Sequence, residues 1–251
     1  APSGQPQWKF AAIPDRAPTI ALAKDPERQP RGSLQMSYKI EDDYGVTEAQ
    51  AHFVARPGDR AKGAAEPRPL FEPPQFPLVL PNARTRNGVG QTVKDLSEDP
   101  YAGADVTLTL TAKDEAGNEG KSEPFNMRLP ERLFTKPLAR ALIEQRRVLA
   151  LDANQNTQVS AALEALMIAP ELFTPEAGHY LGLYSVARQL EAVRDQVGRD
   201  ERREPEGVLV EVHRRMQAAG LLERGPVVTS GGEGVERPGR RGEEPEGVDA
   251  D

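Results

Sequence analysis

The stretch SLQMSYKIEDDYGVTEAQAHFVAR, residues 33–56, decides the fold. Apolar and polar residues alternate over 33–42 and again over 46–56, and this period of two is that of a half-buried β-strand. Between the two runs lies an acidic cluster that ends in Gly45. Asp favours turns because it hydrogen-bonds its own backbone, and Gly accepts a positive φ. We therefore expect two strands joined by a β-hairpin turn at Asp42-Asp43-Tyr44-Gly45.

Other segments between residues 18 and 130 have the same period. The clearest is ADVTLTLTAKD (104–114), which continues through the turn residues Asp114, Gly117 and Asn118 into a pairing run at 119–130. Shorter candidate strands lie at 19–25 and 76–81. Short strands separated by turns are typical of an antiparallel sandwich. Tyr101 precedes the strongest strand, where immunoglobulin-like sandwiches often use a tyrosine to fix the connection.

After residue 131 the hydrophobic period changes to 3.6, which predicts helices. We expect helices over 135–152, 157–170 and 174–196. Thr135 and Thr174 are the expected N-caps, with Pro137 and Pro175 in the first turns. The apolar stripe of the third helix predicts helix–helix packing. Arg140, Arg146 and Arg147 are expected on a solvated face of the first helix.

These patterns divide the chain into four regions. Residues 1–17 form a linker. Residues 18–131 form an immunoglobulin-like antiparallel β-sandwich with a solvent-exposed, proline-rich loop at 57–75. Residues 132–196 form a short helical region, and 197–251 form a disordered or frameshifted tail. The predicted fold class is therefore β plus α.

Several long motifs resemble one known family. They are YKIEDDYGVTEAQ, PLFEPPQFPLVLP, GQTVKDLSEDPYAGADVTLTLTAKDEAGNEGKSEPFNMRLPER, FTKPLARALIEQRRVLALD and LMIAPELFTPEAGHYLGLYSVARQL. From about residue 15 to 195 the chain resembles domain of unknown function family 4175. The resemblance implies a large protein anchored in the inner membrane of Gram-negative bacteria, with its soluble part in the periplasm. It implies no catalytic residue, because the family has no established activity.

The sequence leaves the family pattern after about residue 195. There the family continues with amphipathic helix, whereas this chain changes to Gly, Arg, Glu, Val and Pro. Out-of-frame reading of GC-rich DNA favours these residues, so we favour a frameshift over a genuine divergent tail. The chain begins at Ala1 rather than Met, and we expect it to be a fragment whose membrane segments lie upstream.

Composition excludes several function classes. The chain has no Cys, which removes disulfides, thiolate metal sites and cysteine nucleophiles. A net charge of −7 gives no electrostatic reason to expect nucleic acid as a partner. The three histidines share no zinc-ligand spacing, and neither a serine-hydrolase elbow nor a P-loop is present. We expect no enzyme and no cofactor.

Two function classes stay open. The first is a non-enzymatic structural or interaction segment whose partners are proteins or its own missing C-terminal helical region. The second is a ligand-binding β-sandwich that holds calcium or a carbohydrate on its loops. The calcium candidates are Asp42, Asp43, Asp114 and Asn118, although each loop alone offers fewer than the six to eight oxygens that Ca²⁺ requires. A purely structural role of these residues in turns is the favoured interpretation.

Overall fold

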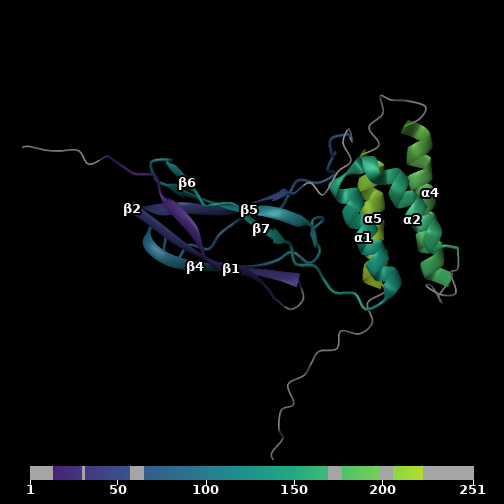
Figure 1. The fold of residues 1–251 in the computed structure, drawn as a ribbon, viewed down its shortest axis with the longest axis horizontal. Helices are drawn as coiled ribbons and strands as arrows, with labels where there is room; N and C mark the ends of the chain where they lie inside the picture. Colours follow the sequence, from purple (N-terminus) through teal and green to yellow (C-terminus); the bar gives the residue numbers. More distant parts are fainter. Residues whose placement is uncertain (1–13, 30–31, 57–64, 169–176, 198–205, 223–251) are drawn as a thin grey trace, which may run out of the picture.

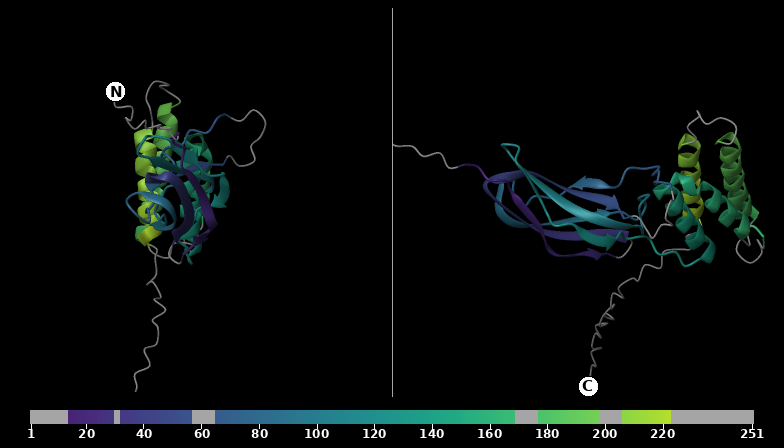
Figure 2. Two further views of the ribbon diagram at one scale, coloured as in Figure 1. Left: turned by 90° about the vertical axis from the view of Figure 1, so that its left-hand side faces the viewer. Right: turned by 45° about the horizontal axis from the view of Figure 1, so that its top comes forward.

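The computed structural model describes residues 14–29, 32–56, 65–168, 177–197 and 206–222 (Figure 1). It contains an elongated antiparallel sheet with a group of helices at one end, and other views show the same arrangement (Figure 2). The strands are β1 (Thr19–Arg28), β2 (Ser33–Ala55), β3 (Gln75–Pro77), β4 (Thr85–Asp95), β5 (Asp105–Asp114), β6 (Glu119–Lys121) and β7 (Phe125–Arg128). The helices are α1 (Pro137–Leu151), η2 (Ala153–Gln155), α2 (Asn156–Leu166), α4 (Ala177–Val197) and α5 (Glu206–Leu222).

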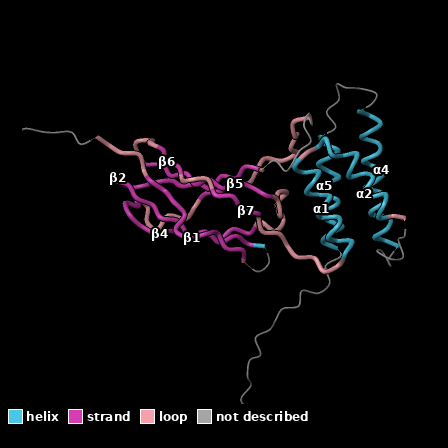
Figure 3. Tube along the Cα trace, in the orientation of Figure 1, coloured by secondary structure: helices cyan, strands magenta, loops and turns pink. Residues whose placement is uncertain are grey.

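The described strands form one hydrogen-bonded sheet curled into a half-barrel, with every pairing antiparallel. Figure 3 shows the strands and the helices as separate regions of the chain. The predicted β plus α class is therefore confirmed. The predicted hairpin from β5 across residues 114–118 to β6 and β7 is also present.

The hairpin predicted at Asp42–Gly45 was wrong. Residues 33–55 form the single 23-residue strand β2, which changes partners at this point. Its first half pairs with β1 and β4, and its second half pairs with β3 and β5. Asp42 Oδ2 accepts hydrogen bonds from the amides of Tyr44 and Gly45, and Gly45 has a φ of 112°. The turn chemistry is real, but it bends a continuing strand instead of reversing it.

Strand β4 lies in a stretch where no strand was predicted. Its sequence TRNGVGQTVKD contains two glycines and few apolar residues, so its alternation is weak. Gly90 pairs with Tyr38, whose buried ring lies over it. The Tyr38 hydroxyl contacts the Val79 carbonyl at 2.6 Å and Thr92 Oγ1 at 2.7 Å. The glycine therefore makes room for an aromatic ring that fixes the β3–β4 connection.

We expect Gly90→Ala to destabilise the sheet by about 2 kcal/mol, because extra atoms in a packed core force neighbouring groups to shift. A Cβ at Gly90 would lie 2.4 Å from Tyr38 Cε2 and 2.9 Å from the Val79 carbonyl oxygen. Gly88→Ala is the matched control, since its Cβ meets nothing closer than 3.2 Å. Urea denaturation measures both variants, and equal midpoints would contradict the role given to Gly90.

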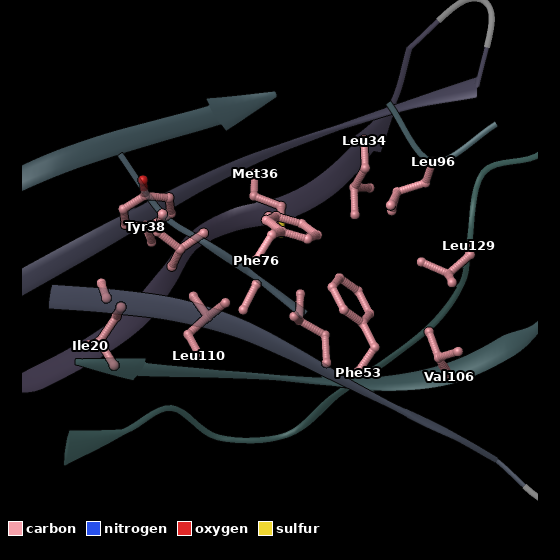
Figure 4. Packing of buried hydrophobic residues seen from close by; sticks show 14 of the residues in the cluster. Ile20, Leu34, Met36, Tyr38, Phe53, Phe76, Leu96, Val106, Leu110 and Leu129 are labelled. Atoms are coloured by element: carbon pink, nitrogen blue, oxygen red, sulfur yellow. The ribbon is translucent and has the colours of Figure 1, made fainter. Parts of the chain in front are cut away.

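Two hydrophobic cores stabilise the molecule. In the sheet core, side chains from both halves of β2 meet those of β5, and Phe76 of β3 lies among them (Figure 4). Phe53 and Phe76 pack at 5.7 Å between ring centroids. In the helical core, residues of α1, α2 and α4 pack with Leu209, Val212 and Met216 of α5.

Two predictions concern the helical region, namely the start of α1 and the tail that contains α5. The predicted N-cap Thr135 lies one residue too early, because Lys136 occupies that position and makes no side-chain cap. Pro137 does lie in the first turn. Helix α5 lies inside the tail that was expected to be disordered or frameshifted, where the pattern indicated no more than a short helix at 208–219, and its residues Leu209, Val212 and Met216 are fully buried. The expected cap Thr174 lies outside the described residues.

Candidate functional site

The calcium candidates from both loops meet at the end of the sheet away from the helices. Asn118 Nδ2 donates to Asp114 Oδ2 at 2.8 Å and to Asp15 Oδ2 at 3.1 Å. Partial desolvation and the neighbouring carboxylates of Asp114, Asp43 and Asp42 raise the pKa of Asp15. The structure thus brings Asp42, Asp43, Asp114 and Asn118 into one acidic end, together with Asp15, which the sequence pattern did not single out.

The acidic end has the chemistry of turns. Burial works to raise the pKa of Asp114, but hydrogen bonds from Asn118 and from the backbone amides of residues 116–118 lower it overall. Asp42 Oδ2 accepts the amides of Tyr44 and Gly45. Among the described residues, no group of three His, Asp or Glu side chains is arranged to hold a metal ion. Backbone amides therefore occupy Asp42 Oδ2 and Asp114 Oδ1, whereas the buried Asp42 Oδ1 makes no hydrogen bond within the described residues.

A second cluster lies at the opposite end, where the sheet meets the helices. Part of the proline-rich loop forms this joint, although solvent exposure was expected there. The amide of Leu70 donates to the carbonyl of Ala150 at 3.0 Å, and the amide of Ala153 donates to the carbonyl of Arg68 at 2.8 Å. Leu70 packs against the helical core while Phe71 packs against the sheet core. The loop therefore connects both cores.

Arg146 of α1 is the central side chain of the joint. It is 1% exposed, so the predicted solvated face was wrong for this residue. Its Nη2 donates to the carbonyl oxygen of Asp99 at 2.7 Å. Burial lowers the pKa of Arg146, and the carboxylates of Asp99 and Glu98 oppose that shift. The guanidinium thus ties the first helix to the loop before β5.

Asp99 and Tyr101 hold the loop that receives Arg146. Asp99 Oδ1 accepts a hydrogen bond from the amide of Tyr101 at 2.8 Å, and burial raises the pKa of this carboxyl. The buried Tyr101 hydroxyl donates to the carbonyl of Phe71 at 2.7 Å. Tyr101 therefore joins the proline-rich loop to the segment before β5.

Helix α5 closes the joint. His213 is 3% exposed, and its ring lies 4.5 Å from the ring of Phe71. Gln217 Nε2 donates to the carbonyl of Glu98 at 3.2 Å. Burial, reinforced by the positive charges of Arg146 and Arg214, lowers the pKa of His213 to about 3. His213 is therefore neutral at pH 7.

The family model described as domain of unknown function DUF4175 matches residues 1–205. The chain belongs to the DUF4175 family. No match is found among curated proteins. The matched residues include the sheet, the proline-rich loop and helices α1, α2 and α4, whereas α5 begins at residue 206.

The DUF4175 chain contains no helix, in the part that the structure describes, that is long and apolar enough to cross a membrane. Of the aromatic residues that a carbohydrate could stack on, Tyr38, Phe53, Phe76 and Tyr101 are buried. Tyr44 is the exposed aromatic on the sheet among the described residues, at 52%. One ring makes a poor stacking platform.

We expect Tyr101→Phe to destabilise the joint by about 1 kcal/mol, because the carbonyl of Phe71 loses its buried donor. Tyr44→Phe removes the same atom from an exposed residue and is the matched control. Thermal denaturation followed by circular dichroism compares the two variants. If both shift the midpoint equally, the Tyr101 hydroxyl has no special role.

Proposed function

We propose that this chain is a non-enzymatic structural and interaction segment that holds a helical region in a fixed position on a β domain. One observation carries the proposal. The joint is built from a buried arginine and from backbone hydrogen bonds on both sides of the proline-rich loop. A buried charge in a loose joint would be unstable, because water would have to replace its partners as the parts moved. The arrangement favours rigidity.

The absence of Cys makes the test simple. Single cysteines placed at the exposed positions Val89 on β4 and Leu181 on α4 would be the only thiols in the protein. Spin labels at both positions report the distance between sheet and helices. We expect one narrow distance distribution, and we expect Arg146→Ala to broaden it. A broad distribution in the parent protein would argue against a structural spacer.

We further propose that the sheet is an immunoglobulin-like sandwich whose two layers share β2. Two features support this. The bend at Asp42–Gly45 separates the two sets of partners of β2, and the Tyr101 hydroxyl bonds a backbone carbonyl as in a tyrosine corner, although its partner Phe71 lies 30 residues upstream. An experimental structure compared by strand order with immunoglobulin domains tests this classification.

Membrane anchoring is also a proposal, and it is supported by family membership. We propose that segments outside this sequence anchor the protein in the bacterial inner membrane and that the sheet lies in the periplasm. Labelling an introduced cysteine at Val89 of the full-length protein in intact cells, with a thiol reagent that crosses only the outer membrane, tests the location. Efficient labelling supports the periplasm, and labelling only after lysis contradicts it.

The calcium alternative would use the acidic end. A ligand that binds only the native state raises its melting temperature, and the stabilisation grows with the logarithm of the ligand concentration once this exceeds Kd. We expect millimolar Ca²⁺ to leave the midpoint unchanged to within about 1 °C, since no group of three acidic or histidine side chains among the described residues is arranged to hold a metal ion. A rise that grows with calcium concentration and disappears in Asp114→Asn would instead establish a metal site.

A further inference from the structure

Helix α5 lies between α1 and α4, against the joint. Its buried residues Leu209, Val212 and Met216 follow the spacing of an amphipathic helix. They pack with buried residues of the neighbouring helices, namely Leu138, Leu142 and Leu149 of α1 and Leu183, Val186, Ala187 and Leu190 of α4. We call these apolar residues of α1 and α4, together with Arg146 and Phe71, the α5 seat. Its apolar part is well filled.

The polar centre of the α5 seat is poorly matched to its occupant. Arg146 Nε and His213 Nε2 are both buried, and neither makes a hydrogen bond within the described part of the protein. Buried polar atoms nearly always make a hydrogen bond, so two unsatisfied buried atoms in one small region are unusual. The two side chains also repel when His213 carries a proton. Histidine is therefore a poor partner for this arginine.

The residues matched by the family model include the α5 seat but not helix α5. The DUF4175 match ends at residue 205, so it includes both helices of the seat and the loops around Arg146. Helix α5 lies wholly beyond the match. The α5 seat thus lies within the matched residues, whereas helix α5 lies beyond them.

We propose that the α5 seat is a docking site for a separate amphipathic helix that carries a glutamate or aspartate at the position of His213. The proposal rests on the proposed role as an interaction segment. A carboxylate would accept hydrogen bonds from the guanidinium of Arg146, and charge-assisted bonds of this kind are the strongest that arginine makes. Apolar residues at the positions of Leu209, Val212 and Met216 would fill the rest of the seat.

The charged groups around position 213 favour one additional carboxylate there. Arg146 faces it from α1, and Arg214 lies next to it in α5. Asp99 and Glu98 approach Arg146 from the loop before β5. Asp99 Oδ1 already accepts the amide of Tyr101, and the bond from Arg146 goes to the Asp99 backbone, so Nε still lacks a partner.

The first test uses the full chain. We expect His213→Glu to raise the urea midpoint at pH 7 above that of His213→Gln, which has nearly the same size without the charge. Both variants remove the imidazole, so the comparison isolates the attraction to Arg146. A midpoint for His213→Glu equal to or below that of His213→Gln would overturn the proposal.

The second test supplies the helix separately. In a full-length variant with Leu209→Asp and Met216→Asp, the chain's own α5 loses its apolar face. A labelled peptide of residues 206–222 with His213→Glu is titrated into this variant and followed by fluorescence anisotropy. We expect it to bind about tenfold more tightly than the unchanged peptide. The control peptide carries both Asp substitutions and should not bind.

Other occupants would appear as distinct results. Equal affinity of the two peptides would show that the seat does not prefer a carboxylate at position 213 and that α5 is its proper occupant. Failure of both peptides to bind would show that the seat is not a docking site. Either result overturns the proposal. Dimerisation of the variant in sedimentation would make a second copy the occupant, which also overturns it. If the variant does not fold, the comparison of His213→Glu with His213→Gln decides alone. The spin-label distances separate these failures from failure of the proposed structural role.

Discussion

Replacing Arg146 with Ala is expected to lower the free energy of unfolding by about 3–5 kcal/mol, because a buried charge-assisted hydrogen bond and a large buried side chain are lost together. Three losses add up. The carbonyl of Asp99 loses its donor, Asp99 and Glu98 lose their buried cation, and the space of a large, fully buried side chain is left empty. Urea denaturation followed by far-ultraviolet circular dichroism measures the change.

Arg147→Ala is the control for Arg146→Ala. Arg147 is the next residue on α1, but it is partly exposed and pairs with Glu131 at 2.8 Å near the surface. Its loss is expected to cost about 1 kcal/mol or less. Arg146→Met, which keeps the volume without the charge, is expected to recover most of the stability. Equal effects of Arg146→Ala and Arg147→Ala would show that the joint does not depend on the buried guanidinium.

Lowering the pH from 7 to 5 is expected to destabilise the helical region by about 2 kcal/mol through His213. Its pKa is about 3 in the folded protein, against an ordinary value of 6.5. Between these values the unfolded chain binds a proton that the folded chain does not. The stabilisation is thus complete above pH 6.5 and is lost progressively as the pH falls toward 3. Urea midpoints at several pH values measure the slope.

Asp99 also contributes to the pH dependence of stability. Burial raises the pKa of Asp99, so this carboxyl favours the folded state at lower pH and opposes His213 only near and below the range where carboxyls titrate. The window from pH 7 to 5 therefore reports mainly on histidine. His213→Gln should flatten the slope in this window, while His52→Gln should keep it. An unchanged slope in His213→Gln would place the acid sensitivity elsewhere.

The sequence predicted the elements whose side chains alternate or repeat clearly. The strand at 104–114, the hairpin that follows it and the helix at 174–196 carry strong hydrophobic periods, and they correspond to β5, β6 with β7, and α4. Strand β4 was missed because its burial depends on the ring of Tyr38 lying over Gly90, a contact between residues 52 positions apart. The local sequence pattern does not indicate that contact.

The site was harder to predict than the fold. Asp42 and Gly45 were correctly given a role in backbone geometry, but local turn chemistry does not say whether a strand reverses or bends. Arg146 looks like any surface arginine of an amphipathic helix, because its burial depends on a loop 47 residues away and on α5. A buried charge is decided by tertiary partners, and one sequence does not reveal them.

The spin-label and stability predictions depend on one claim, that sheet and helices form a single structural unit. Differential scanning calorimetry of the full chain at pH 7 tests it most directly. The account predicts one transition whose calorimetric and van't Hoff enthalpies agree, and two transitions in Arg146→Ala. Two independent transitions in the parent protein would contradict the rigid joint and, with it, the proposed structural role.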